Sequence, residues 1–583
     1  MTDSLIHFYF TYLFVPNFLL VLYTLYLIIY KSKNKGLYTI LLVALTFLIK
    51  FNTFYFNCGS NDETGWIAYV HALAADFNPY ISVDPTTSGI GALIPLYLFD
   101  QIIHINYFTI RLLETIIDMV TLYFTYKILI TRIGNNKNLL YLSMMFLYCI
   151  LNVSFMRDFY TYNTEHFCVL VFAVLLYILN NLFIQGDKGN DQTTASNISI
   201  NIAGLLVGFS LFIKLQNLPV MFFMFMFFLL YLMVKKYFRQ AFFFIVCCII
   251  PVLTCLLFFW YKGSIHDFYI RYLITNLEYS DNGVIDAHLQ AKTGLSLHSI
   301  IEHSSFIFIE VYSLVFLSIF MVVLLNLRYI LRTYKPIMAF SMKKVKTYVS
   351  DHKLQIIFLL FFIIDTFEIV KPKNFFDHYY LLLYQPLILL FVCVSKLQVK
   401  KWVMVFIVTI NFIFIFGKNY IYAEADITDT SRYIPFRESQ HRAHFVSIFG
   451  ADKQYHNELK QLDSVVKATN ADDRYIMVWG QDIRIYAYSR YLSAFRDIGN
   501  YHLLAHKGEM KTYYINDFMS DLDKNVKGNK IILIEETKGK SLANSQSFEE
   551  FVNENNLEGH FKIIKLLPTY PLYSFHVIEM ERN

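Results

Sequence analysis

An α-helical polytopic membrane protein with a small C-terminal soluble α/β domain is the fold class that this sequence predicts. Hydrophobic residues make up 56% of the 583 residues, aromatic residues 18% and charged residues only 16%. The mean hydropathy of +0.43 is typical of a chain whose larger part lies in lipid. Long apolar stretches recur through the first 417 residues, whereas the remainder alternates helix-like and strand-like runs.

Twelve apolar stretches are long enough, or nearly so, to cross a bilayer. They lie at about 8–30, 37–56, 108–130, 138–154, 165–184, 198–213, 217–234, 241–261, 305–327, 354–370, 379–395 and 401–417. The first stretch lacks a basic leader and a small-residue cleavage site, so we expect it to be a retained span. The prediction is therefore about twelve transmembrane helices.

The distribution of Lys and Arg predicts the orientation of these spans. One alternate set of connecting segments carries nineteen Lys and Arg, and the other set carries seven. Positive charge stays on the cytoplasmic side, so the poorer set, which includes the loops 57–107 and 262–304, is expected outside. The C-terminal region after residue 417 is then extracytoplasmic as well. We expect an integral protein of the bacterial inner membrane.

Two domains follow from this division. Residues 1–417 form the transmembrane domain, and residues 418–583 form the small extracytoplasmic domain. In the loop 57–107, the residues Trp66, Tyr69, Val70, Leu73 and Phe77 recur at helical spacing, which predicts a helix on the membrane surface. In the C-terminal domain, a helix is expected around Leu459 to Val466, and strands are expected at Tyr475–Trp479, Lys530–Glu535, Phe561–Leu567 and Leu572–Ile578.

The doublet Asp62-Glu63 is the first candidate for chemistry. It opens the loop 57–107, which has no Lys or Arg, at the rim of a span where ionised side chains are expensive to keep. Asp62 is a candidate general base. Glu63 is either catalytic or the N3 residue of a capping box with Ser60, and both interpretations stay open.

Cations are scarce in the outer segments, so those that occur there are candidates for binding an anion. They are Arg157, Lys214, Lys262, Arg271, Lys292, Lys371 and Lys373. Lys214 stands out because it lies at a tight turn between two short spans and precedes Pro219. The alternative for each cation is a lysine or arginine that reaches the interface from a helix end.

Further carboxylates lie near the outer ends of other spans. Glu165 begins the fifth span and is either a catalytic candidate or a helix cap. Arg111, Glu114 and Asp118 share one helical face, and we expect them to neutralise each other inside the bundle. Asp365 and Glu368 precede Lys371 in a densely ionic segment that is either an ion network or the lining of a polar cleft.

Several other classes of site are not indicated. Six of the seven cysteines lie in apolar runs, and no Cys/His metal spacing, Walker loop, Gly-x-Ser-x-Gly motif or nucleic-acid-binding module is present. We expect no cofactor, no nucleic-acid partner and no required metal, although a divalent metal is compatible with the sequence.

Short motifs follow one another in an order typical of one family. They are Asp62-Glu63 with Trp66-Ile-Ala-Tyr69, Asn78-Pro79-Tyr80, Thr164-Glu165, Lys214 to Pro219, His378 to Pro386, Trp479-Gly480 and Ile485-Tyr-Ala-Tyr488. In this order the chain resembles membrane-embedded glycosyltransferases of the GT-C type, in the branch of protein O-mannosyltransferases and lipid A aminoarabinose transferases. The resemblance covers nearly the whole chain.

The resemblance implies a polyprenyl-phosphate sugar donor, inversion at the anomeric carbon and no metal. Two departures stand out. The first span is additional to the usual core, and residues 82–94 hold only Asp84 as a charge where aminoarabinose transferases carry a basic residue. The sugar of that branch is therefore not carried over to this chain.

The residues and the resemblance together predict transfer of a hexosyl or pentosyl group to a lipid, glycan or protein acceptor outside the membrane. Asp62 is the expected base, with Glu63 and Glu165 as further catalytic candidates. Lys214, Arg271, Arg157 and Lys371 are expected at the donor phosphate. The alternatives are a transporter or flippase of lipid-linked sugars, and a ligase or polymerase that uses diphosphate-linked oligosaccharides.

Overall fold

The computed structural model describes most of the chain. The described residues are 13–31, 33–50, 54, 61–85, 87–152, 161–187, 194–282, 313–326, 360–361, 363–364, 377–395, 397–424, 459–468, 475–480, 483–506, 508–526, 530–536, 547–566 and 575–582. The chain divides into two compact units. Unit 1 comprises Met1–Tyr55, Arg111–Leu253 and Gly294–Thr430, and unit 2 comprises Phe56–Ile110, Thr254–Thr293 and Ser431–Asn583.

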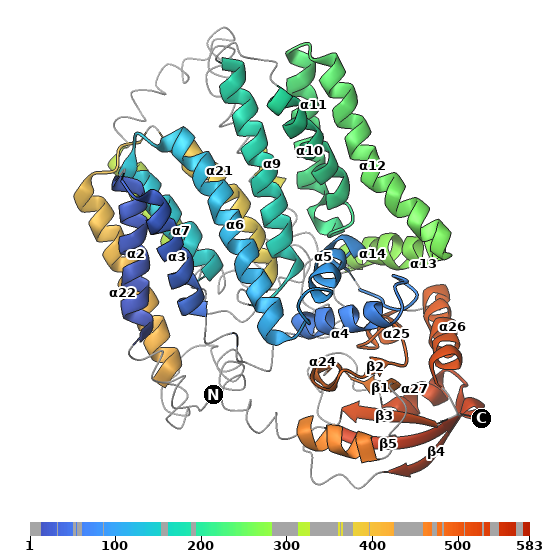
Figure 1. Cartoon of the computed structure of the whole chain (residues 1–583). Coiled ribbons are helices and arrows are strands. Elements are labelled where there is room, and N and C mark those ends of the chain that lie inside the picture. The colour runs from blue at the N-terminus through green and yellow to red at the C-terminus, as the bar shows by residue number, and fades with distance from the viewer. Residues whose placement is uncertain are drawn as a thin grey trace. The chain divides into compact units, whose positions relative to one another are not determined.

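Unit 1 is built from apolar helices (Figure 1). Its described helices are α2 (Phe14–Tyr30), α3 (Lys35–Lys50), α6 (Tyr107–Ile133, which starts in unit 2), α7 (Lys137–Asn152), α9 (Thr164–Asp187), α10 (Thr194–Ser210), η3 (Leu215–Asn217), α11 (Leu218–Val234), α12 (Phe238–Lys262, which ends in unit 2), α17 (Ser313–Leu325), η6 (Asp377–Leu383), α21 (Tyr384–Cys393) and α22 (Lys401–Glu424). They fall on eleven of the twelve predicted apolar stretches. Most of the remaining stretch, 354–370, lies outside the described residues.

Three helical segments in the described part of the chain have the length and the apolar composition needed to cross a membrane. They are Thr164–Ile184, Leu215–Val234 and Phe238–Lys262. Shorter apolar helices accompany them at Val15–Tyr30, Ile90–Asp100, Asn197–Ser210, Tyr379–Cys393 and Lys401–Ile413. The class of protein is therefore a helical membrane protein, while the full number of spans stays a prediction.

Close helix contacts in unit 1 depend on small residues. A Cβ atom built on Gly208 of α10 would lie 2.1 Å from the carbonyl oxygen of Cys248 in α12. At Gly204, one turn earlier, it would lie 2.6 Å from the carbonyl oxygen of Phe244. The two helices therefore approach to a distance that only glycine permits, as small residues allow between membrane helices.

Unit 2 joins segments that are far apart in the sequence. Its described helices before the sheet are α4 (Asn61–Ala75), α5 (Ile90–Asp100), α13 (Ile265–Asp267), the π-helix η4 (Phe268–Ile274) and α14 (Thr275–Asn282). The helix predicted in the loop 57–107 is confirmed as α4, and Trp66, Tyr69, Val70 and Leu73 are buried. Phe77 lies beyond its end.

A mixed five-stranded sheet forms the α/β part of unit 2. The strands are β1 (Tyr475–Trp479), β2 (Leu492–Ser493), β3 (Lys530–Glu536), β4 (Phe561–Leu566) and β5 (Phe575–Arg582), in the order β2-β1-β3-β5-β4. Strand β1 pairs in parallel with β2 and β3, and β5 pairs antiparallel with β3 and β4. The helices are a segment at 459–468, α24 (Arg484–Ser489), α25 (Tyr501–Ala505), α26 (Gly508–Asn525), α27 (Phe548–Glu554) and η8 (Glu558–His560).

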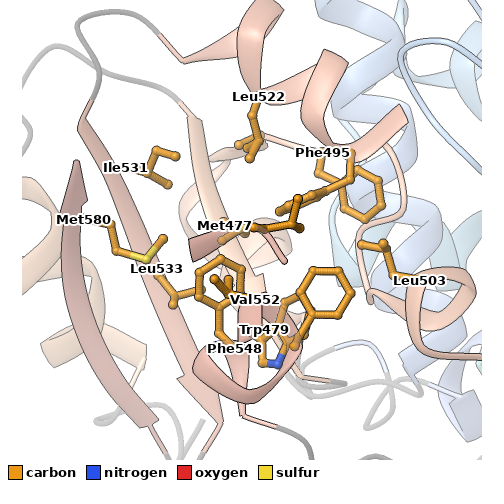
Figure 2. Packing of buried hydrophobic residues seen from close by; sticks show 14 of the residues in the cluster. Met477, Trp479, Phe495, Leu503, Leu522, Ile531, Leu533, Phe548, Val552 and Met580 are labelled. Carbon is orange, nitrogen blue, oxygen red and sulfur yellow. The ribbon is translucent and has the colours of Figure 1, made fainter. Parts of the chain in front are cut away.

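The core of this sheet combines aliphatic and aromatic side chains (Figure 2). Trp479 packs against Phe548 and Phe551 at ring-centre distances of 5.0 and 4.8 Å. The predicted strands agree with those observed except at the last. The described part of β5 runs from Phe575 through Arg582, past the predicted end at Ile578, and residues 572–574 lie outside the described residues. The apolar criterion ended the prediction too early, because alternate residues of this strand are polar.

Candidate active site

Asp62 and Glu63 lie in the first turn of α4. Asp62 is exposed and Glu63 is fully buried, so the two neighbouring carboxylates have different surroundings. Burial raises the pKa of Tyr69 on the same helix well above its usual value, and the charges of Asp84, Asp497 and Asp62 raise it further. The negative charge of Asp62 therefore acts on the aromatic side of α4, as expected from a helix that carries Tyr69 two turns later.

Glu165 and Lys214 form an ion pair in unit 1. Glu165 lies in the first turn of α9, and Lys214 is the N-cap of η3. The Lys214 ammonium donates a hydrogen bond to Glu165 Oε1, and both side chains are buried. The ammonium also lies 4.7 Å from the ring centre of Tyr379 in η6, a distance at which a cation is attracted to an aromatic face. Two residues predicted separately thus meet, and an aromatic ring joins them.

The carboxylates of α6 have partners on two other helices. Lys50 Nζ, at the end of α3, lies 2.6 Å from Glu114 Oε1 and 3.0 Å from Asp118 Oδ2. His166 Nδ1, in α9, lies 2.9 Å from Asp118 Oδ1. The expectation that Arg111 alone would neutralise these carboxylates is therefore incomplete, because Lys50 supplies a positive charge from another helix.

Residues of α6 and α9 together have the composition of a cation site. One ligand atom from each of Glu114, Asp118 and His166 lies within 4.8 Å of the other two, and all three side chains are buried. Two carboxylates and an imidazole suit a divalent metal. The ammonium of Lys50 contacts both carboxylates, so a metal here would compete with that ion pair.

Arg271 is surrounded by carboxylates in unit 2. Its side chain is fully buried in η4; Nη1 donates to Asp84 and Nη2 donates to Asp517. Its Nε lies 3.6 Å from Asp267 Oδ1. Although burial alone would lower the pKa of Arg271, the charges of Asp84 and the neighbouring groups raise it. Arg271, which was predicted to bind the donor phosphate, thus contacts three acidic side chains.

Arg496 forms a second charged group beside Arg271. Its Nη2 and Nε lie 2.6 and 2.8 Å from the two carboxylate oxygens of Asp521, a bidentate pair. Its Nη1 donates to Asp267 Oδ1 and to the backbone oxygen of Tyr80, both at 3.1 Å. Asp267 thus lies between two guanidinium groups. The network joins the loop 57–107, the segment 262–282 and the α/β part of unit 2.

Two titratable groups in this network have strongly shifted pKa values. Burial, and after it the charge of Asp84, raises the pKa of Asp497 to about 7. Burial lowers the pKa of His502 to about 4, against the charge of Asp84, which opposes the shift. His502 Nδ1 lies 3.3 Å from His506 Nε2, and His506 Nδ1 lies 3.2 Å from Glu278 Oε2. A row of acid and base groups therefore runs from Asp84 to Glu278.

Some predicted residues lie outside the described part of the chain. They are Ser60, Arg157, Lys292, Asp365, Glu368, Lys371 and Lys373. The predicted capping box and the roles of Arg157 and Lys371 at the phosphate accordingly stay predictions.

Several residues of these clusters were not predicted from the sequence. Lys50 lies within the apolar stretch 37–56 and was not singled out. A lone lysine there is nevertheless a signal, because an intramembrane charge needs a partner. Asp84 was noted as the single charge in residues 82–94, but no partner or role was predicted for it. No sequence signal singled out Asp517 from the other acidic residues of its helix.

The described helices and the mixed sheet give the fold of a helical membrane protein with an α/β part. Among solved structures, the chain is similar to ArnT from Cupriavidus metallidurans bound to undecaprenyl phosphate, with 10% identity over 94% of this chain and 98% of that chain and a TM-score of 0.51. The apo state of the same protein gives 10% identity, 93% and 98% coverage, and a TM-score of 0.52. ArnT belongs to the branch that the motifs indicated, and at this identity the likeness establishes the fold.

No protein-family model matches the chain, and no curated protein sequence matches it. The likeness to ArnT is therefore a likeness of fold.

Proposed function

We propose that this protein is a glycosyltransferase that moves a hexosyl or pentosyl group from a polyprenyl-phosphate donor to an acceptor on the extracytoplasmic side, with inversion. The observation that carries the proposal is the buried Glu165–Lys214 pair beside Tyr379, in a fold shared with a protein whose structure is bound to undecaprenyl phosphate. A lysine that a buried carboxylate and an aromatic ring hold in place is suited to bind a phosphate.

The chemistry assigns one role to each kind of group. A carboxylate takes the proton of the acceptor hydroxyl, whose oxygen forms the new bond to the anomeric carbon. The bond between that carbon and the phosphate oxygen breaks, and polyprenyl phosphate leaves with the additional negative charge. Asp62 is the proposed base, with Glu165 as the alternative, and Glu63 acts through the structure of α4. Lys214 stabilises the charge on the leaving phosphate.

Lys214 and Glu165 can exchange partners during this reaction. A donor phosphate that binds Lys214 competes with Glu165 for the ammonium. Glu165 is then released from its ion pair in the same event that places the donor. This exchange keeps the lysine charge compensated both with and without donor, which a buried cation requires.

The experiment measures transfer from polyprenyl phosphates that carry radiolabelled glucose, mannose or arabinose, using the purified full chain in lipid nanodiscs and a mixture of lipid, glycan and peptide acceptors. Asp62→Asn is expected to reduce turnover by about 10²-fold while donor binding stays within about twofold. Lys214→Met is expected to reduce turnover by about 10²- to 10³-fold.

A control separates catalysis from folding. Lys214→Met leaves the Glu165 carboxylate buried without its cation, which by itself destabilises the protein. The double variant Lys214→Met/Glu165→Gln removes both charges, so we expect it to be folded and still inactive. If the wild-type protein moves the labelled lipid across the membrane without transferring the sugar, the enzyme proposal is wrong and a flippase is favoured.

A further inference from the structure

Lys214 and Asn217 lie at the two ends of the same short turn. The backbone N–H of Asn217 donates to the Lys214 carbonyl oxygen at 3.2 Å, which closes the 3₁₀ turn of η3. Lys214 itself has an extended backbone (φ −159°, ψ 124°) and precedes the helix. Asn217 therefore follows Lys214 by three residues within one turn.

The Asn217 side chain is only 2% exposed, and its Oδ1 and Nδ2 have no hydrogen-bond partner among the described residues. A buried polar atom without a partner has lost its hydrogen bonds to water and destabilises the protein, so such a side chain calls for an explanation. Other buried asparagines in unit 1 do form side-chain hydrogen bonds. Asn411 Nδ2 donates to the Ile407 oxygen at 2.8 Å, and Asn180 Nδ2 donates to Thr131 Oγ1 at 2.9 Å.

The chemistry of a carboxamide indicates its ligand. It offers one acceptor oxygen and two donor hydrogens and carries no charge. A phosphate would use only the donors and an ammonium only the acceptor, whereas hydroxyl groups both donate and accept. Neighbouring hydroxyls of a sugar ring can therefore satisfy both polar atoms at once.

We propose that Asn217 binds hydroxyl groups of the transferred sugar, and that the donor sugar is uncharged and hydroxylated at that position. This inference rests on the proposed function, in which Lys214 holds the donor phosphate. The sugar is attached directly to that phosphate, and Asn217 belongs to the same turn as Lys214. Asn217 then determines specificity, because a donor without those hydroxyls leaves the buried amide unsatisfied.

Equilibrium binding to the purified full chain tests this inference without turnover. The ligands are undecaprenyl phosphate alone and the same lipid carrying glucose, mannose or arabinose. For at least one sugar, we expect the wild-type protein to bind the sugar-bearing lipid at least about tenfold more tightly than the sugar-free lipid, the equivalent of one or two hydrogen bonds. Asn217→Leu, which keeps the branching at Cγ, should lose this preference and bind the sugar-free lipid as the wild type does.

Asn411→Leu is the matched control, because it removes another buried asparagine of the same unit, and it should keep the preference. Asn217→Asp is the second variant, and it should shift the preference towards a lipid that carries an amino sugar. A preference that persists in Asn217→Leu, or a wild-type protein with no preference for any of the three sugars, would overturn the inference.

The two proposals fail in different ways. If the wild type transfers sugar and Asn217→Leu keeps the sugar preference, the glycosyltransferase proposal holds and the proposed role of Asn217 is wrong. If the sugar preference depends on Asn217 but no acceptor receives sugar, Asn217 is a sugar-binding residue and the glycosyltransferase proposal is wrong.

Discussion

Replacement of Asp497 by Asn should reveal two opposed pH dependences in the stability of unit 2. Asp497 is 1% exposed, and its Oδ2 accepts a hydrogen bond from the backbone N–H of His502 at 2.8 Å. Its pKa rises from 3.8 to about 7 on folding. The folded state therefore holds a proton that the unfolded state has lost between about pH 4 and 7, and stability falls as pH rises through this window. The loss is complete above about pH 7 and amounts to ~4 kcal/mol.

His502 acts in the opposite direction. Its pKa falls from 6.5 in the unfolded chain to about 4 in the folded chain. The unfolded state binds the additional proton between about pH 4 and 6.5, so stability rises with pH there by ~3 kcal/mol. In the wild type the two contributions nearly cancel over this range. Asp497→Asn should therefore show stability that increases with pH by ~1.4 kcal/mol per unit, and His502→Gln should show a decrease.

The assay is urea unfolding of the full chain in mild detergent between about pH 4 and 8. Hydrogen exchange of peptides from β1 and β3 monitors the unfolding. These strands lie in the core of the sheet and report the opening of unit 2. The double variant Asp497→Asn/His502→Gln is the control and should have neither slope. Parallel pH profiles for the wild type and Asp497→Asn would refute the argument.

Three further variants test packing and charge. Gly208→Ala should lower the melting temperature of unit 1, because the new Cβ atom would lie 2.1 Å from the Cys248 carbonyl oxygen. Lys50→Met should destabilise the protein by ~3–5 kcal/mol, because it removes the ammonium from two buried carboxylates, one of them Glu114, and thermal unfolding in detergent measures it. Trp479→Ala should cost ~3–5 kcal/mol in unit 2, measured by urea unfolding, because it removes the ring between Phe548 and Phe551.

Each of these variants has a comparison. Gly36→Ala is the matched control for Gly208, because no atom lies within 4 Å of its added Cβ, and it should leave the melting temperature unchanged. Lys50→Met/Glu114→Gln should recover part of the stability lost in Lys50→Met, and no recovery would mean that the two side chains are not coupled. A Trp479→Phe variant that is as unstable as Trp479→Ala would show that ring packing is not the cause.

The helices could be predicted from the sequence because each apolar stretch must satisfy its own backbone groups in lipid, which leaves the helix as the local solution. The strands were harder at their ends. Glu579 and Glu581 in β5 pair with Ile532 and Lys530 of β3, so backbone pairing extends the strand past the last apolar run. The association of residues 56–110 and 254–293 with 431–583 depends on contacts at long sequence separation, which periodicity does not encode.

The candidate site was predicted only as single residues. Glu165 and Lys214 were singled out separately, and their pairing could not be found because 48 residues lie between them. Lys50 was hidden for a similar reason, since its partners lie on another helix. The sequence thus indicates which groups are too costly to bury alone, and the fold decides which group compensates each of them.

Lys214 and Arg271, the two predicted phosphate-binding cations within the described residues, differ in the charge around them. Arg271 and Arg496 share the carboxylates of Asp84, Asp267, Asp517 and Asp521, which leaves an excess of negative charge. A phosphate that approached this group would be repelled and would have to break several hydrogen bonds at once. Lys214 has one carboxylate partner and an aromatic ring, so a phosphate can replace Glu165 in a single exchange. Arg271 is accordingly suited to hold together distant segments of unit 2, and Lys214 to bind a ligand that arrives and leaves.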